Sequence, residues 1–133
     1  MTDRRLRLAV GVLSAAGAAV AGYLVYARYT DTTLACATGG CETVQRSDYA
    51  LIAGIPVAVL GLGAYLVLLA TAFSTSEIAR VVGAVVAGSG TLFAAYLLYA
   101  QIVVIDAVCQ WCVASDVLIF LLAVTCVLRL RSG

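Results

Sequence analysis

The chain alternates between four long apolar runs and short polar segments. The runs cover residues 8–27, 49–76, 81–105 and 109–128, and each is uncharged or nearly so. An α-helix rises ~1.5 Å per residue, so about 20 residues cross the hydrocarbon core of a bilayer. Because every run reaches this length, the pattern predicts an all-α integral membrane protein with a bundle of four transmembrane helices.

The second run contains a helix boundary at Gly54-Ile55-Pro56, because proline suits the first turn of a helix and is awkward in its interior. Residues 30–55 then form one extramembrane loop between the first two helices, with a turn signal at Gly39-Gly40 and a short interfacial helix expected around 42–53. The whole chain, 1–133, is interpreted as a single membrane domain. Its helices are expected at about 8–28, 56–73, 78–105 and 109–128.

Composition excludes a soluble domain and narrows the chemistry. Hydrophobic residues make up 64% of the chain and charged residues 11%, whereas soluble domains are ~45–50% apolar. The net charge of +1 provides no basic field for nucleic acid. Histidine is absent, which removes the commonest general base and metal ligand and leaves the five cysteines as the candidate reactive groups.

The arginines predict the orientation of the bundle. If the four helices alternate in direction, two basic residues, Arg28 and Arg46, fall on one side of the membrane and all the others on the opposite side. Positive charge accumulates on the cytoplasmic side. We therefore expect a multi-pass protein of the plasma (inner) membrane with both termini cytoplasmic and with loop 30–55 and the turn at Asp106 extracytoplasmic. The arginines on the cytoplasmic side are Arg4, Arg5, Arg7, Arg80, Arg129 and Arg131.

A cleaved signal peptide is the competing interpretation of the first run, because arginines precede it. The apolar stretch is longer than the ~7–15 residues of a signal-peptide core, so a retained membrane helix is favoured. A lipoprotein signal ending at Cys36 fits less well, because Thr33 stands where an aliphatic residue is expected.

Small residues recur at alternating four- and three-residue spacing on two of the expected helices. Small side chains on one face let helix backbones approach closely in lipid. We interpret both sets as helix-packing faces. They are Gly11, Ala15, Ala18 and Gly22 on the first helix, and Gly83, Ala87, Gly90 and Ala94 on the third.

A Cys-X-X-Cys motif, Cys109-Gln110-Trp111-Cys112, stands at the start of the fourth helix. Two cysteines at this spacing can bond to each other, and the positive end of the helix dipole stabilises a thiolate. The same spacing also supplies half of a zinc site. The motif alone therefore favours a dithiol redox centre and leaves zinc open.

A second pair, Cys36 and Cys41, lies in loop 30–55 on the same expected side of the membrane. Four cysteines there could form two structural disulfides, a four-thiolate zinc site, or a relay in which one disulfide is exchanged for another. Lipid already holds the helices together, and thiolate zinc sites are disfavoured where thiols are oxidised. The relay is favoured, and no metal is expected.

Cys126 lies near the cytoplasmic end of the fourth helix, roughly four turns from Cys112. At that separation it cannot join an exchange with the motif. We expect a small buried packing residue, as free cysteine often is.

These segments resemble the bacterial branch of the vitamin K epoxide reductase family, from Cys36 to about Leu118. The resemblance rests on residues 36–50, on Gly54-Ile55-Pro56-Val57, and on the run from Cys109 to Ser115. It implies that four helices surround a quinone headgroup of menaquinone, ubiquinone or vitamin K type, capped from outside by the loop.

The resemblance also implies a role for each site residue. Cys109 and Cys112 would form the active-site pair, with Cys112 beside the quinone. Cys41 would bond Cys109 in the mixed state, and Cys36 would be the first to react with a partner. Ser47 matches the loop serine that supports this segment near the quinone.

Asp116 and several polar or aromatic residues are further candidates for the quinone site. Asp116 follows Cys112 by one helical turn, and an ionisable group inside a membrane helix is costly. It could protonate or hydrogen-bond the quinone, or it could be an acid that stays hydrated near the interface. The remaining candidates could line the quinone site, but tyrosine and tryptophan also gather in belts at the membrane–water interface. For most of these candidates a place in the belt is favoured. The remaining candidates are Tyr96, Tyr99, Gln101 and Trp111.

The predicted function is quinone-dependent oxidation of protein thiols. Electrons would pass from a thioredoxin-fold extracytoplasmic partner to Cys36 and Cys41, then to Cys109 and Cys112, and then to a membrane quinone. Many bacterial relatives carry the thioredoxin-fold domain fused, and this sequence lacks one, so a separate partner is expected. The alternatives are a vitamin K epoxide or quinone reductase proper, and a metal-binding membrane subunit.

Overall fold

The computed structural model describes residues 3–30, 51–52, 55–105 and 110–132. Helices dominate these segments, because their long apolar runs lack prolines after Pro56. The helices are α1 (Asp3–Thr30), α3 (Val57–Ala72), α4 (Glu77–Tyr99), which continues into the π-helical segment η2 (Ala100–Ile105), and α5 (Gln110–Ser132). The strands are β1 (Leu51–Ile52) and β2 (Ile55–Pro56).

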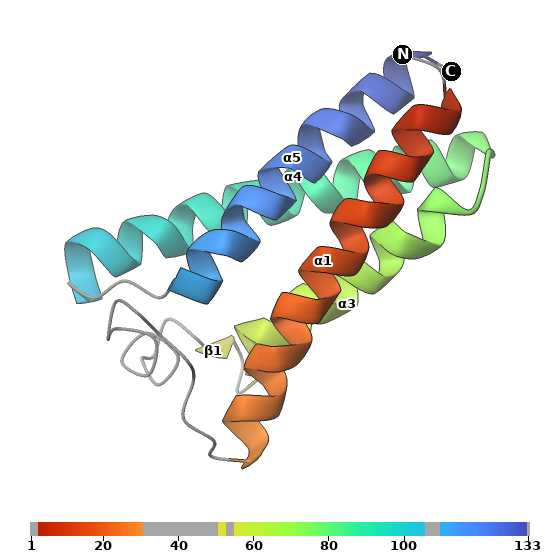
Figure 1. The fold of residues 1–133 in the computed structure, drawn as a ribbon. Helices are drawn as coiled ribbons and strands as arrows, with labels where there is room; N and C mark the ends of the chain where they lie inside the picture. The colour runs from red at the N-terminus through yellow and green to blue at the C-terminus, as the bar shows by residue number, and fades with distance from the viewer. Residues whose placement is uncertain (1–2, 31–50, 53–54, 106–109, 133) are drawn as a thin grey trace.

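The helices form a bundle of two pairs (Figure 1). α1 runs beside α3 and α4 runs beside α5, and further contacts join α1 to α5 and α3 to α4. The chain termini lie together where the pairs converge, and the pairs lean apart toward the opposite end, near β1 (Figure 1). We call the first the arginine end, which holds Asp3, Arg7 and Arg129, and the second the cavity end, which holds Gln101 and Cys112.

Most of the outer surface of the bundle is apolar. Val12 and Leu92, for example, expose 68% and 77% of their surface. Three helical segments are long and apolar enough to cross a membrane, Asp3–Tyr26, Glu77–Val104 and Gln110–Arg131. α3 is apolar but has only 16 residues. The protein is therefore an all-helical membrane bundle, and a fourth crossing by α3 stays a prediction.

A short hairpin precedes α3. Leu51 pairs with Pro56, and Ile52 with Ile55, in antiparallel register. The structure therefore corrects the expected interfacial helix at its end, because residues 51–52 are strand. The rest of that segment, residues 42–50 and 53, lies outside the described residues. Pro56 ends β2, and α3 begins at the next residue.

The two predicted small-residue faces differ in outcome. On α4, Gly83, Ala87 and Ala94 are buried, and a Cβ atom placed on Gly90 would lie 2.9 Å from Ile119 of α5. That face is a packing face, as predicted. On α1 the most buried positions form a neighbouring stripe, and the predicted face packs only in part. A Cβ atom on Gly11 would lie 3.7 Å from Ala72 of α3, and Ala18 packs against the core. Ala15 is exposed, and a Cβ atom on Gly22 would meet nothing within 4 Å. The buried stripe of α1 is Val10, Ser14, Gly17, Ala21 and Leu24.

At the arginine end, guanidinium groups bind carbonyl groups at and just beyond the C-terminus of α3. Arg129 of α5 donates from Nη1 to the Thr71 carbonyl at 2.8 Å and from Nη2 to the Ser74 carbonyl. Arg7 of α1 donates from Nε to the Ala72 carbonyl at 3.0 Å. The last carbonyls of a helix have no partner within it and carry partial negative charge, so cations stabilise them.

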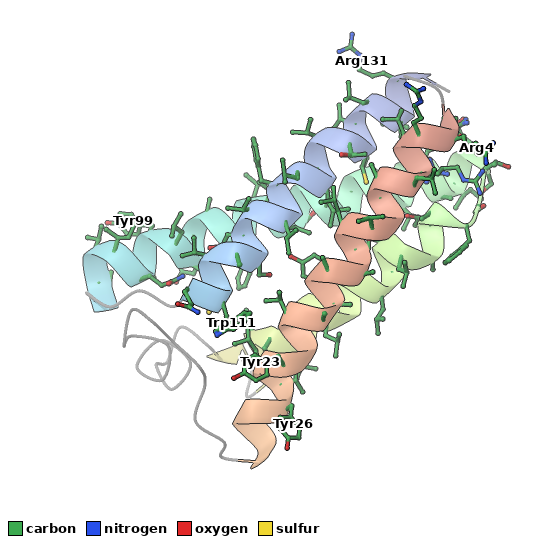
Figure 2. The ribbon with its side chains drawn as sticks, viewed as in Figure 1. Arg4, Tyr23, Tyr26, Tyr99, Trp111 and Arg131 are labelled. Atoms are coloured by element: carbon green, nitrogen blue, oxygen red, sulfur yellow. The ribbon has the colours of Figure 1, made fainter. Side chains whose placement is uncertain are left out.

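An ion-pair network ties the other helices to the same point. Asp3 Oδ1 lies 3.5 Å from Arg80 Nη2 of α4 and 3.5 Å from Arg129 Nε. Ser76 caps α4, since its hydroxyl accepts from the Ala79 N–H at 3.2 Å. Figure 2 places Arg4 and Arg131 at this same end. Among the described residues, the arginines other than Arg28 therefore gather at one end of the bundle, and Arg28 lies in the last turn of α1 toward the other end. Which side of the membrane each end faces stays a prediction.

Candidate functional site

Cys112 is the described cysteine at the cavity end, in the first turn of α5. It is half-buried and lines a cavity of about 90 Å³ between the two helix pairs. Ala21 and Leu24 of α1 and Ala58 of α3 form the apolar wall. The polar wall consists of Gln101, Ser115 and Asp116 together with the Cys112 thiol.

A larger cavity of about 480 Å³ adjoins the first one, because both are lined by Val57, Gly61, Leu97, Ser115 and Asp116. It lies between α3, α4 and α5, and its lining is mostly aliphatic and aromatic. A small chamber that carries a thiol and three other polar side chains on its wall thus adjoins a larger apolar space. That combination suits an amphipathic molecule with a compact polar head and an apolar tail.

A hydrogen-bonded pair of hydroxyl groups stands on the wall of the larger cavity. Tyr65 of α3 donates from Oη to the Ser115 carbonyl of α5 at 2.7 Å, and its Oη lies 2.8 Å from Ser115 Oγ. Tyr65 exposes only 2% of its surface. This is a direct polar contact between the two helix pairs, one turn below Cys112.

Gly17 of α1 makes room for the Tyr65 ring. A Cβ atom at position 17 would lie 2.1 Å from Cε1 of that ring, far inside contact distance. Only glycine leaves the space for the ring to pass α1 and reach α5. The position of the Tyr65 hydroxyl therefore depends on three helices.

Asp116 and Gln101 both lie at the cavities. Asp116 is half-buried and lines both of them, one turn from Cys112 on α5. Gln101 is 2% exposed and lines the smaller cavity. It stands in η2, where the wider π-helical turn changes the direction of the side chains that follow α4.

The aromatic candidates lie elsewhere among the described residues. Trp111 is half-buried and meets Tyr23 of α1 edge to face, with ring centroids 5.1 Å apart (Figure 2). Tyr96 and Tyr99 expose 51% and 59% of their surface on the outside of α4. None of these three is among the lining residues of the two cavities.

Four of the predicted site residues lie outside the described residues, namely Cys36, Cys41, Ser47 and Cys109. Cys126 is described and is a free thiol that is 3% exposed. It belongs to the hydrophobic core, and a Cβ atom on Gly83 of α4 would lie 3.4 Å from its Sγ. The prediction of a buried packing cysteine is confirmed.

Together these features define a class of protein: a helical membrane protein with a thiol on the wall of a cavity that continues into an apolar space. The chain matches the family model described as "Vitamin K epoxide reductase family" over residues 8–127, and it belongs to that family. The family consists of membrane oxidoreductases whose thiol or epoxide chemistry is linked to quinones.

Sequence reasoning missed Tyr65, Gly17 and the role of Ser115. Each is unremarkable by itself in an apolar helix, and the signal lies in their combination across three helices. A tyrosine in the middle of α3 needs a partner for its hydroxyl when it is buried. Ser115, three residues after Cys112, was the available hint.

Proposed function

We propose that this protein oxidises the thiols of an extracytoplasmic thioredoxin-fold protein and passes the electrons to a membrane quinone. The observation that carries the proposal is the position of Cys112 beside other polar side chains on the wall of a small chamber that adjoins a larger apolar cavity. A quinone ring fits the first environment and its prenyl tail fits the second. Family membership adds that the chemistry is oxidoreduction.

The proposed electron route follows the four extracytoplasmic cysteines. The partner's dithiol would reduce a Cys36–Cys41 disulfide by thiol–disulfide exchange, and that pair would in turn reduce a Cys109–Cys112 disulfide. The Cys109–Cys112 dithiol then returns to a disulfide, giving up two electrons and two protons. A quinone that accepts both becomes the hydroquinone, so each cycle balances with one partner dithiol oxidised.

The residues around Cys112 would assist in three ways. The N-terminus of α5 stabilises a Cys112 thiolate through the helix dipole. The apolar walls from α1 and α3 exclude water and strengthen polar interactions inside the chamber. Asp116 would hydrogen-bond or protonate the bound ring, with Ser47 supporting the cap. Trp111 and Tyr96 stay predictions as ring contacts, and their observed places suit an interfacial belt equally.

The proposed topology places the arginine end in the cytoplasm and the cavity end outside it, with α3 as the fourth crossing. α3 spans ~24 Å at ~1.5 Å per residue, slightly less than the hydrocarbon core. The test is labelling, by a membrane-impermeant maleimide, of a cysteine placed at the exposed Thr75, between α3 and α4, in a variant whose five native cysteines are replaced by alanine. Labelling only in inverted vesicles supports the topology, and labelling in intact cells contradicts it.

The function is tested with purified full-length protein, a short-tailed ubiquinone, and a reduced thioredoxin-fold protein as electron donor. Cys112→Ala is expected to lower the rate of quinone reduction at least ~100-fold, because it removes the reacting sulfur. Cys126→Ala, which removes a buried sulfur from the same helix, is the matched control and is expected to keep wild-type turnover.

The variant Cys41→Ala tests the order in which electrons pass through the two cysteine pairs. It is expected to block electron transfer from the thioredoxin-fold protein but to retain quinone reduction by dithiothreitol, which reaches the Cys109–Cys112 pair directly. Undiminished turnover in Cys112→Ala contradicts the proposed function. Efficient reduction of vitamin K epoxide by a small dithiol, with no gain from any protein thiol, supports the epoxide-reductase alternative instead.

A further inference from the structure

The Ser115 hydroxyl differs from four other hydroxyl groups inside these helices. Serine and threonine in a helix usually donate back to a carbonyl three or four residues earlier. Thr71, Thr91 and Thr125 do so, as does Ser14, with acceptors at Leu68, Ala87, Leu121 and Val10. Ser115 instead has its hydroxyl turned to Tyr65 Oη, at 2.8 Å. The Tyr65 ring thus holds this one hydroxyl at the cavity wall.

The hydrogen count of the pair shows what it can offer a ligand. A phenol has one hydrogen, and here Tyr65 donates it to the Ser115 carbonyl at 2.7 Å. The Ser115 hydroxyl is then the donor in the contact between the two oxygens. If Ser115 donates to a ligand instead, Tyr65 can donate to Ser115 Oγ without moving a heavy atom. The result is a chain of hydrogen bonds in one direction, which polarises each member.

Position makes this chain relevant to the thiol. Ser115 lines both the chamber that holds Cys112 and the larger cavity, whereas Tyr65 lines only the larger one. Ser115 is three residues from Cys112, hence on nearly the same face of α5. We propose that the Ser115 hydroxyl donates a hydrogen bond to a ring carbonyl oxygen of the bound quinone, and that Tyr65 is its positioning residue. This inference rests on the proposed function.

The chain also contains a matched control for this pair. Thr91 of α4 donates from Oγ1 to Ala87 and, at 3.3 Å, to the carbonyl of Ile119, one turn beyond Ser115 on α5. It is thus a second hydroxyl that reaches a carbonyl of α5 from another helix, but it lines neither cavity. Removal of the Thr91 hydroxyl therefore shows how much an interhelical hydrogen bond to α5 contributes to structure when it does not face a cavity.

The experiment compares Ser115→Ala, Tyr65→Phe and Thr91→Val in purified full-length protein, with dithiothreitol as reductant and a short-tailed ubiquinone as acceptor. Each variant removes a hydroxyl and keeps the shape of the side chain nearly unchanged. We expect kcat/KM for the quinone to fall about three- to tenfold in Ser115→Ala and Tyr65→Phe, the loss of roughly one hydrogen bond. Thr91→Val is expected to stay within about twofold.

A spectroscopic readout separates ligand binding from fold. With the ring carbonyls of the quinone labelled with carbon-13, infrared difference spectra report the stretching band of the bound carbonyl. A hydrogen bond lowers this frequency, so we expect a higher frequency in Ser115→Ala than in wild type, and recovery in Ser115→Thr. Thermal unfolding of Ser115→Ala should match that of Thr91→Val.

Each outcome decides between the proposals. Equal kcat/KM and equal carbonyl bands in Ser115→Ala and Thr91→Val overturn this inference and leave the proposed function intact, provided that the wild-type protein reduces the quinone. A wild-type protein that reduces no quinone overturns both. A fall in kcat/KM in Ser115→Ala with an unchanged carbonyl band also overturns the inference on Ser115, because the hydroxyl would then support only the structure of the protein.

Discussion

The two ends of the bundle use polar groups in opposite ways. At the arginine end, guanidinium groups from α1 and α5 bind the carbonyls that end α3, and Asp3 forms ion pairs with Arg80 and Arg129. At the cavity end, polar side chains of α5 and η2 line one or both of two cavities. The first end fastens the helices together, and the second leaves room for a ligand.

The difference indicates a division of labour along each helix. α5 contributes Cys112, Ser115 and Asp116 to the cavities in its first turns, and Cys126 and Arg129 to packing in its last turns. A helix pair that is held firmly at one end can lean apart at the other without losing the fold (Figure 1). Substitutions at the arginine end should therefore change stability, and those at the cavity end should change turnover.

The largest effect on stability is expected from Arg129→Met. Arg129 is 2% exposed, donates to the carbonyls of Thr71 and Ser74, and pairs with Asp3. Its loss leaves those buried acceptors without a charged donor, which should lower the free energy of unfolding by roughly 3 kcal/mol. The measurement is thermal or denaturant unfolding in detergent, together with kcat of the folded fraction, which should stay near the wild-type value.

The control for Arg129 is Arg131→Met. Arg131 is exposed at the same end and is expected to change the free energy of unfolding by less than ~0.5 kcal/mol. If Arg129→Met and Arg131→Met have the same free energy of unfolding, the network does not stabilise the bundle. If it keeps its stability but loses turnover, the division of labour is wrong.

A smaller loss of stability, with a clear loss of activity, is expected from Gly17→Ala. The new Cβ atom would lie 2.1 Å from the Tyr65 ring, which is held between Gly17 and Ser115. Overpacking of this kind costs about 2 kcal/mol. The ring must shift, so the Tyr65–Ser115 bond should break and kcat/KM for quinone should fall as in Tyr65→Phe.

Gly22→Ala on the same helix is the matched control, because nothing lies within 4 Å of its added Cβ atom. It should be neutral or slightly stabilising, since alanine is the better helix former. The double variant Gly17→Ala/Tyr65→Leu should regain part of the lost stability without regaining activity. Equal stabilities of Gly17→Ala and Gly22→Ala would contradict the close contact between α1 and α3.

Sequence predicted well what depends on local composition. Apolar length predicted the helices, and Pro56 predicted the start of α3 at Val57. The distribution of arginines predicted that most of them gather at one end, as the described ones other than Arg28 do. Such features follow from the cost of placing charges or unpaired backbone groups in lipid, and that cost does not depend on neighbouring helices.

Features that depend on how helices rotate against one another could not be predicted. The stripes of Gly11 and Gly17 on α1 have the same spacing, and only the position of Tyr65 on α3 decides which one is buried. The π-helical turn that brings Gln101 to the chamber has no sequence signal of its own. Of the predicted site residues, Cys112, Asp116 and Gln101 line the same cavity, and the first two were chosen from spacing on one helix.

A modest effect is expected from Asp3→Asn. Asp3 is partly exposed and pairs with Arg80 and Arg129 at 3.5 Å, so its charge contributes less than Arg129 does. The neutral amide should lower the free energy of unfolding by about 1 kcal/mol, and the loss should shrink in high salt. Unfolding midpoints at low and high salt measure it. A loss that is independent of salt would mean that packing of the N-terminal turn, not charge, matters there.

The smallest effect is expected from Cys126→Ala, the packing cysteine on the same helix as Cys112. It is 3% exposed in the core beside α4, and deleting its sulfur should cost ~0.5–1 kcal/mol through the small cavity left behind. Gly83→Ala should add a methyl group next to that space, since its Cβ atom would lie 3.4 Å from Cys126 Sγ. The double variant Gly83→Ala/Cys126→Ala should therefore be more stable than Cys126→Ala alone. Double-mutant unfolding measures this coupling. Loss of quinone turnover in Cys126→Ala would mean that electrons reach the arginine end of α5, and the contrast between the two ends would fail there.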